Sequence, residues 1–204
     1  MTLPVLSHTT DHFPGSAADA AVLVVPDLSE SAESLVAYPG LADALAGIGF
    51  TGAASSYTRV YAPEVTSLPF AVVGTGSAAN ETAVRNAVGA ALRSLTGFEN
   101  VAVGLAAGLE QFAAAAAEGA VLGGYRFDTY RSDKGKSRAA AVTLHAEIDE
   151  ASIAKAQAVG EAVALIKDLG LQPTPKVRTV GQYVIDSADP LGEGSGWVDV
   201  RAKH

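Results

Sequence analysis

Short apolar runs recur along this chain and alternate with longer helical patterns. The clearest runs are Ala20–Val25, Phe70–Val73 and Asn100–Gly104. An apolar run of this length is typical of a strand covered on both faces, as the strands of parallel sheets are. The segments between and after these runs have apolar residues at helical spacing. This alternation predicts an α/β fold, a three-layer sandwich around a mostly parallel or mixed central sheet.

Weaker patterns complete the predicted element order. A strand at Leu3–Leu6 is expected to pair with the strand at 20–25, and further strands are expected at 58–61 and 139–144. Helices are predicted over 41–46, 81–95, 109–122 and 150–169. Asn80 is the expected N-cap of the second of these helices, because a short polar side chain there can accept a backbone hydrogen bond. The last helix is predicted to turn one apolar stripe inward, made of Ile153, Ala156, Val159, Val163 and Ile166.

The charge balance restricts the partners. The 204 residues include 14 Lys and Arg against 22 Asp and Glu, a formal net charge of −8. Nucleic-acid binding depends on clustered cations, so the balance argues against a nucleic-acid partner.

The absence of cysteine excludes disulfides and thiolate zinc sites. Residues 1–10 lack the features of a signal peptide, and no apolar stretch approaches the roughly 20 residues that span a bilayer. We therefore expect a soluble cytoplasmic protein with no membrane partner.

A glycine-rich turn joins one predicted strand to the following helix. Gly74, Thr75, Gly76 and Ser77 precede Ala79 in a Gly-x-Gly-x-x-Ala pattern. Such a turn can present a helix N-terminus to an anion or nucleotide. It can equally be a tight turn, and Glu99 precedes its strand instead of ending it, which departs from the dinucleotide-binding pattern. Both interpretations stay open, and we favour the tight turn.

No pattern predicts a catalytic centre or a metal site. The histidines His8, His12, His145 and His204 show no metal-ligand spacing. His8 and His12 are expected in a loop and His145 at the end of a strand. Gly194-Ser195-Gly196 lacks the preceding apolar strand that a nucleophile elbow needs.

Aromatic and basic residues alternate where the helix over 109–122 ends. Aromatic side chains and Arg are enriched at protein interfaces. The same residues can instead cover the sheet edge, so an interface and a packing role are both open. The candidates are Tyr125, Arg126, Phe127 and Tyr130, followed by Arg131 and Lys134.

The same segment carries a family resemblance. Residues 117–130, AEGAVLGGYRFDTY, resemble the N-terminal domain of the leucyl aminopeptidases, also called cytosol aminopeptidases or peptidase family M17. The order of strands and helices agrees with that domain from Leu3 to Leu169. The resemblance implies a macro-domain-like fold joined by its last helix to a separate catalytic domain. In the family that catalytic domain uses two divalent metals, zinc or manganese, to release N-terminal amino acids from peptides within a homohexamer.

The resemblance weakens after the last predicted helix. Lys167-Asp168-Leu169 is similar to the family's entry to the interdomain segment, but residues 170–175 differ from it. Nothing beyond matches the family's metal-binding motifs, so we expect no catalytic residue and no cofactor in this chain. We expect an α/β domain over 1–169 and an interdomain-like or divergent tail over 170–204. The predicted role of the chain is subunit assembly, as the non-catalytic N-terminal domain of a leucyl aminopeptidase. The alternative is a macro-domain-like module that binds a nucleotide or ADP-ribose.

Overall fold

The computed structural model describes residues 3–15, 17–126 and 135–168 of the chain. The predicted domain boundary near residue 169 and the tail after it lie outside the described residues. Both therefore stay predictions.

A single six-stranded sheet forms the centre of the described residues, in the order β1-β6-β5-β2-β4-β3. All neighbouring strands are parallel except β3, which pairs with β4 antiparallel. The strands are β1 Val5–Thr9, β2 Ala20–Val25, β3 Tyr57–Val60, β4 Phe70–Gly74, β5 Asn100–Leu105 and β6 Ala141–His145.

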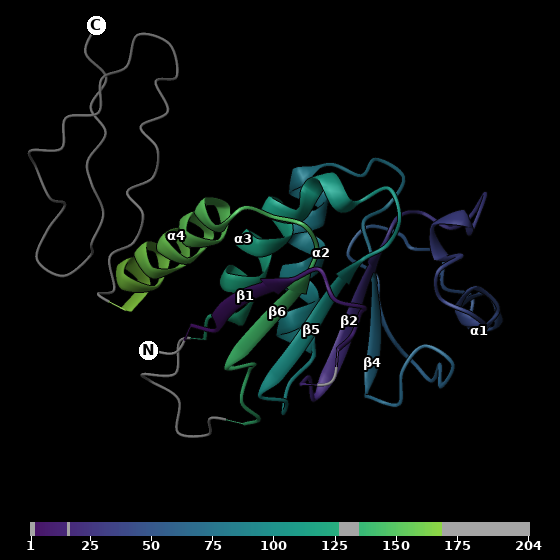
Figure 1. Ribbon diagram of the computed structural model, residues 1–204, viewed down its shortest axis with the longest axis horizontal. Helices are drawn as coiled ribbons and strands as arrows, with labels where there is room; N and C mark the ends of the chain where they lie inside the picture. The colour runs from purple at the N-terminus through teal and green to yellow at the C-terminus, as the bar shows by residue number, and fades with distance from the viewer. Residues whose placement is uncertain (1–2, 16, 127–134, 169–204) are drawn as a thin grey trace, which may run out of the picture. The chain divides into compact units, whose positions relative to one another are not determined.

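Three helices cover one face of this sheet, and Figure 1 shows α2, α3 and α4 side by side along it. The opposite face carries a second apolar cluster over β2 and β4, which includes Leu35, Leu41 and Leu45 from the shorter helical segments. The helices are α1 Leu41–Gly47, α2 Glu81–Ser94, α3 Ala113–Gly124 and α4 Glu150–Asp168, with single 3₁₀ turns at Glu33–Leu35 and Glu110–Phe112. The predicted α/β architecture is thereby confirmed.

Strand β2 is the centre of the sheet, bonded to β4 on one side and to β5 on the other. All six of its side chains are fully buried, because one face packs under the helices and the other under the second cluster. This two-sided burial explains the unbroken apolar run in the sequence.

The predicted pairing of the first strand with the second is wrong. Strand β1 pairs with β6, with Ser7 opposite Thr143. The connection from β1 to β2 instead crosses over β6 and β5 to reach the middle of the sheet. Neighbours in sequence are often neighbours in a sheet, but the pairing here joins the first and the last strand of the described residues.

Helix α3 lies unusually close to both neighbouring helices. A Cβ atom at Gly123 would stand 2.6 Å from the Cα atom of Gly89 in α2, and one at Gly119 would overlap the carbonyl oxygen of Arg85. On its other side, a Cβ atom at Gly160 of α4 would overlap the side chain of Val121. The glycines therefore allow backbone contact between helices that larger residues would separate.

An ion pair links α2 and α3 at their surface. The Arg85 side chain lies 2.7 Å from the Glu118 carboxylate and donates a hydrogen bond to it. Both side chains are partly exposed, so the pair contributes little beside the packing. On α2, Asn80 accepts a hydrogen bond from the backbone N–H of Ala83, as predicted for an N-cap.

The inward stripe of α4 differs from the predicted one. Ala156 and Ala164 are buried and Ile153 packs against the core, whereas Ile166 is 43% exposed. Leu165 beside it is 53% exposed, and Val159, also predicted inward, is exposed. The apolar surface of α4 is thus wider than the surface that α3 and the sheet cover.

We predict that Gly119→Ala lowers the free energy of unfolding by about 1–3 kcal/mol, because the added methyl group overlaps the backbone of α2. Urea denaturation followed by circular dichroism measures this difference. The matched control is Gly47→Ala in α1, where nothing lies within 4 Å of the added atom. Alanine favours helix more than glycine does, so the control is expected to be neutral or slightly stabilising. Equal stability of the two variants would contradict the proposed close contact.

Candidate functional site

Tyr125, the first candidate at the end of α3, is a packed residue in this structure. Its side chain is 6% exposed, and the Nζ atom of Lys167 in α4 stands 5.2 Å from its ring centroid. A cation over an aromatic face is attracted by the ring's electrons. Tyr125 therefore connects the end of α3 to the last turn of α4.

Two arginines hold the backbone around this helix end. Arg126 donates to the carbonyl oxygen of Lys136 at 2.6 Å. Arg138 donates to the carbonyl oxygens of Gly123, at 2.9 Å, and Tyr125. Arg138 thus satisfies carbonyls at the end of α3, a role that basic side chains often have at helix ends, whereas Arg126 reaches the segment that precedes β6. Phe127, Tyr130, Arg131 and Lys134 lie outside the described residues.

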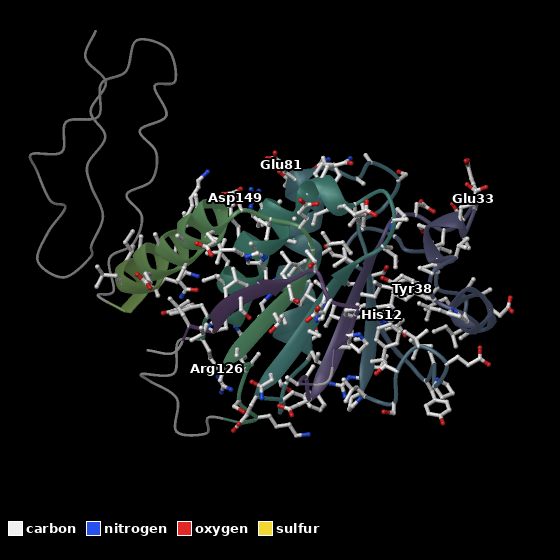
Figure 2. The ribbon with its side chains drawn as sticks, viewed as in Figure 1. His12, Glu33, Tyr38, Glu81, Arg126 and Asp149 are labelled. Atoms are coloured by element: carbon white, nitrogen blue, oxygen red, sulfur yellow. The ribbon has the colours of Figure 1, made fainter. Side chains whose placement is uncertain are left out.

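This helix end lies at the amino ends of the parallel strands. Figure 2 shows Arg126 toward one end of the strands, with Asp149 and Glu81 toward the opposite end. In open α/β sheets, ligands bind at the carboxyl ends of the strands. The position of Arg126 is therefore unlike that of a small-molecule site in such a fold.

The glycine turn after β4 packs closely against the segment 52–54. The backbone N–H groups of Gly74, Thr75 and Gly76 donate to the carbonyl oxygens of Ser56, Val25 and Gly52, at 2.9 Å each. A Cβ atom at Gly74 would overlap the backbone of Gly52, and one at Gly76 would stand 3.1 Å from the Ala54 side chain. All three backbone amides are thus engaged by the protein, whereas Ser77 is exposed. Anion binding at this turn stays a prediction.

An open cavity of about 660 Å³ borders the first turn of α2. Asn80, Glu81 and Thr82 line it with Phe112 from the other side. The Asn80 side-chain oxygen already accepts from Ala83. The Glu81 carboxylate gives this cavity a negative charge, which opposes the entry of a phosphate.

The histidines of the described residues, His8, His12 and His145, form no group that could hold a metal ion. His8 lies in β1 and not in a loop as predicted, while His145 ends β6 as predicted. Within residues 3–15, 17–126 and 135–168, no group of three or more His, Asp or Glu side chains could hold a metal ion. The described residues therefore do not fit a pair of divalent metals, which need several carboxylates close together.

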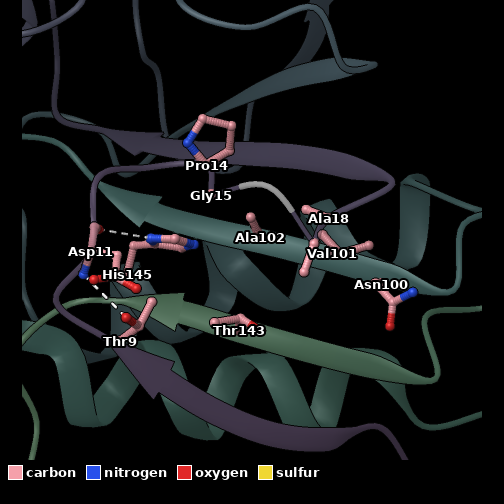
Figure 3. A pocket seen from close by; sticks show the side chains of 11 residues that line it. Thr9, Asp11, Pro14, Gly15, Ala18, Asn100, Val101, Ala102, Thr143 and His145 are labelled. Carbon is pink, nitrogen blue, oxygen red and sulfur yellow. Dashed lines mark hydrogen bonds between the residues drawn. The ribbon is translucent and has the colours of Figure 1, made fainter.

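A smaller cavity of about 290 Å³ lies between the β1–β2 connection and the strands β5 and β6 (Figure 3). We call it the connection pocket; its polar lining residues are Thr9, Asp11, Asn100, Thr143 and His145. Phe13 anchors the connection above the sheet, because its ring lies where a Cβ atom of Gly104 would come within 2.7 Å of it. The ring of His145 contacts the edge of Phe13, with centroids 5.5 Å apart.

Phe13 also makes contacts near the carboxyl ends of the strands. Tyr38 packs on Phe13 with its ring nearly perpendicular, at a centroid distance of 6.2 Å. Burial raises the pKa of the Tyr38 hydroxyl, and the negative charge of Glu110 raises it further. The hydroxyl therefore stays protonated and neutral, as its apolar surroundings require.

Sequence reasoning missed the connection pocket. Its polar residues come from β1, β5, β6 and the β1–β2 connection, which have no common motif. The sequence features that could have indicated this pocket were His145 at the end of a predicted strand and the polar residues 7–12.

Comparison with known proteins identifies the class to which this domain belongs. A sequence model described as "Cytosol aminopeptidase family, N-terminal domain" matches residues 21–134, from β2 past the end of α3. This stretch is more than half of the chain. The chain therefore belongs to the cytosol aminopeptidase family, within which it corresponds to the N-terminal domain.

Curated relatives agree with this assignment. A probable cytosol aminopeptidase of Clavibacter michiganensis is 39% identical over 183 residues, which covers 83% of this chain and 36% of the relative. A probable cytosol aminopeptidase of Gluconobacter oxydans is 35% identical over 185 residues, covering 83% of this chain and 38% of the relative. The chain thus spans a little over a third of the length of these relatives.

Solved structures share the fold. The bottromycin maturation enzyme BotP in complex with Mn is 26% identical with a TM-score of 0.58, over 77% of this chain and 32% of that one. A mutant of tomato leucine aminopeptidase has a TM-score of 0.63 at 21% identity, over 84% of this chain and 39% of that one. Among the helices described in the present structure, none is both long and apolar enough to cross a membrane.

If Tyr125 acts by packing, its removal must destabilise the isolated chain. We predict that Tyr125→Ala lowers the free energy of unfolding by about 3–5 kcal/mol, as truncation of buried aromatic residues does. The control is Tyr61→Ala, because Tyr61 is 85% exposed and its loss should change stability by less than about 0.5 kcal/mol. Urea denaturation at two protein concentrations measures both. A small loss for Tyr125→Ala that grows with protein concentration would instead indicate an interface role.

Proposed function

We propose that this chain is the non-catalytic N-terminal domain of a leucyl aminopeptidase and that it acts in subunit assembly. The catalytic domain with which it works would use two divalent metals, zinc or manganese, to release N-terminal amino acids from peptides. The family match over residues 21–134 carries this proposal. It is supported by the described residues, which offer no group able to hold such metals.

The exposed apolar surface of α4 supports association with a catalytic domain. Leu165 and Ile166 lie exposed near the end of α4, close to where Lys167 contacts Tyr125. Apolar residues grouped on a surface mark contact sites for other proteins. We assign the catalytic domain of the aminopeptidase as the occupant, because the matched relatives are nearly three times as long as the stretch they share with this chain.

The proposed assembly is a homo-oligomer, a hexamer in the family, in the cytoplasm. The names of the relatives, cytosol aminopeptidases, support this location. Nucleic acid and membranes are not among the proposed partners. The net charge of −8 disfavours nucleic acid, and the basic side chains of Arg126 and Arg138 are engaged with backbone carbonyls.

A nucleotide or ADP-ribose module is the alternative function. It would use the turn at Gly74, Thr75, Gly76 and Ser77, at the carboxyl end of β4. The engaged amides of residues 74–76 give this alternative less support than the assembly role. Saturable ADP-ribose binding in calorimetry, lost on Ser77→Asp, would favour it.

We predict that the 204-residue chain alone does not hydrolyse a leucyl amide when manganese or zinc is added, because no described residues can hold a metal pair. A chromogenic leucyl anilide assay measures this, with a complete cytosol aminopeptidase as the positive control. Turnover that increases with protein concentration and disappears with a chelator would contradict the non-catalytic role.

We also predict that Leu165→Glu weakens binding to the catalytic domain of a cytosol aminopeptidase at least about tenfold, because it places a charge in an apolar contact. Light scattering and calorimetry with the separately produced catalytic domain measure the complex. Val36→Glu is the matched control, because Val36 is also exposed but lies outside α4. If both variants bind equally well, the α4 surface is not the contact.

A further inference from the structure

The connection pocket lies on the face of the sheet that α2, α3 and α4 leave open. Side chains alternate between the two faces of a strand. Leu6, Val142 and Leu144 belong to the core beneath the helices, so Ser7 and Thr143 face the other way. There the hydroxyls of Ser7 and Thr143 bond to each other at 3.1 Å, and Val5 is 68% exposed. This half of the sheet is thus polar and accessible beside the pocket.

His145 presents a hydrogen-bond acceptor to this pocket. Its Nδ1 atom lies 3.1 Å from the backbone carbonyl oxygen of Asp11. A carbonyl oxygen only accepts, so Nδ1 carries the hydrogen, and in the neutral form of an imidazole the other nitrogen, here Nε2, has a lone pair that can accept. The ring is held in place by Phe13 and by Gly15, where a Cβ atom would stand 3.2 Å from the ring carbon Cε1. The acceptor is therefore fixed in direction.

Several other polar groups of the pocket already form hydrogen bonds within the protein. The hydroxyl oxygen of Thr9 accepts the backbone N–H of Asp11 at 3.1 Å. The side-chain amide of Asn100 donates to the Asp19 carboxylate at 3.1 Å. The Asp11 carboxylate is exposed, and within the described part of the chain it forms no ion pair. The acceptors that remain for a ligand include the Asp11 carboxylate and Nε2 of His145, and the carboxylate adds negative charge.

The shape of the pocket adds an apolar middle. Figure 3 shows Asp11, His145 and Thr9 at one end, Asn100 at the other, and Ala102, Val101 and Ala18 between them. Its volume of about 290 Å³ is at the lower end of small-molecule sites, which range from about 300 to 1,000 Å³. A ligand that fits is short and aliphatic, with a positively charged hydrogen-bond donor at one end.

We propose that the connection pocket binds a small aliphatic primary amine as its ammonium ion. The ammonium group donates to the Asp11 carboxylate and to Nε2 of His145, and the alkyl chain lies along Ala102 and Ala18. An ammonium group has three donors and no acceptor, which complements the acceptors that this pocket leaves unused. The site is independent of the aminopeptidase assignment, because it needs neither a metal nor a catalytic domain.

A titration of the ¹⁵N-labelled chain with isoamylamine, followed by NMR, tests the proposal. We expect saturable shifts of the backbone signals of Asp11, Gly15, Asn100 and His145, with a Kd on the order of millimolar for so small a ligand. Isoamyl alcohol has the same alkyl chain without the charge and is expected to produce less than about a tenth of the shift at equal concentration. Equal responses to amine and alcohol, or shifts that do not saturate, would overturn the ammonium site.

A pair of variants separates this site from general attraction to an acidic protein. Asp11→Asn keeps the side-chain shape and is expected to weaken amine binding at least about fivefold. Asp43→Asn removes the same charge from the exposed surface of α1 and is expected to change nothing. Equal weakening by both variants, or unchanged binding by Asp11→Asn, would refute the role of Asp11. Neither outcome would affect the peptidase or assembly experiments.

Discussion

The close approach of α3 to its two neighbouring helices is the contact on which the rest of this structure depends. Most packed helices are separated by side chains. Here Gly119 and Gly123 allow the backbone of α3 to lie against that of α2, and Gly160 of α4 leaves space for the side chain of Val121. Close packing of this kind maximises dispersion contacts while ordering few side chains. It explains why a helix as rich in alanine as α3 is a core element. Nine of its twelve residues are buried, so it has no polar face of its own.

This contact also positions the features with functional interest. Because α3 lies between α2 and α4, its end at Tyr125 meets the last turn of α4 at Lys167. Arg138 donates to the carbonyl of Gly123 where the chain leaves α3, and Arg126 donates to the carbonyl of Lys136 in the segment before β6. Tyr125, within residues 117–130 that carry the family resemblance in the sequence, is thus the residue that links the end of α3 to α4.

The concentration of helices on one side has a second consequence. The opposite face of the sheet is covered over β2 and β4 by the cluster around Phe13, Leu41 and Leu45, but it stays open toward β1 and β6. The β1–β2 connection crosses this open region, and Phe13 attaches it above Gly104. A polar pocket results where a third layer is incomplete. Both surfaces proposed for binding, on α4 and at the connection pocket, lie where one layer of the described residues leaves another partly uncovered.

The sequence by itself determined which segments are strands and which are helices, because unbroken apolar runs, apolar residues at helical spacing and the cap at Asn80 are local properties. It also determined the family, through the residues around the end of α3. Only the tertiary structure decided that β1 pairs with β6, that Ile166 is exposed, and that Asp11 and His145 share a pocket. Ser7 and Thr143 are separated by 136 positions, and Asp11 and His145 by 134. Contacts over such separations arise from how the layers pack, and no local pattern of residues records that packing.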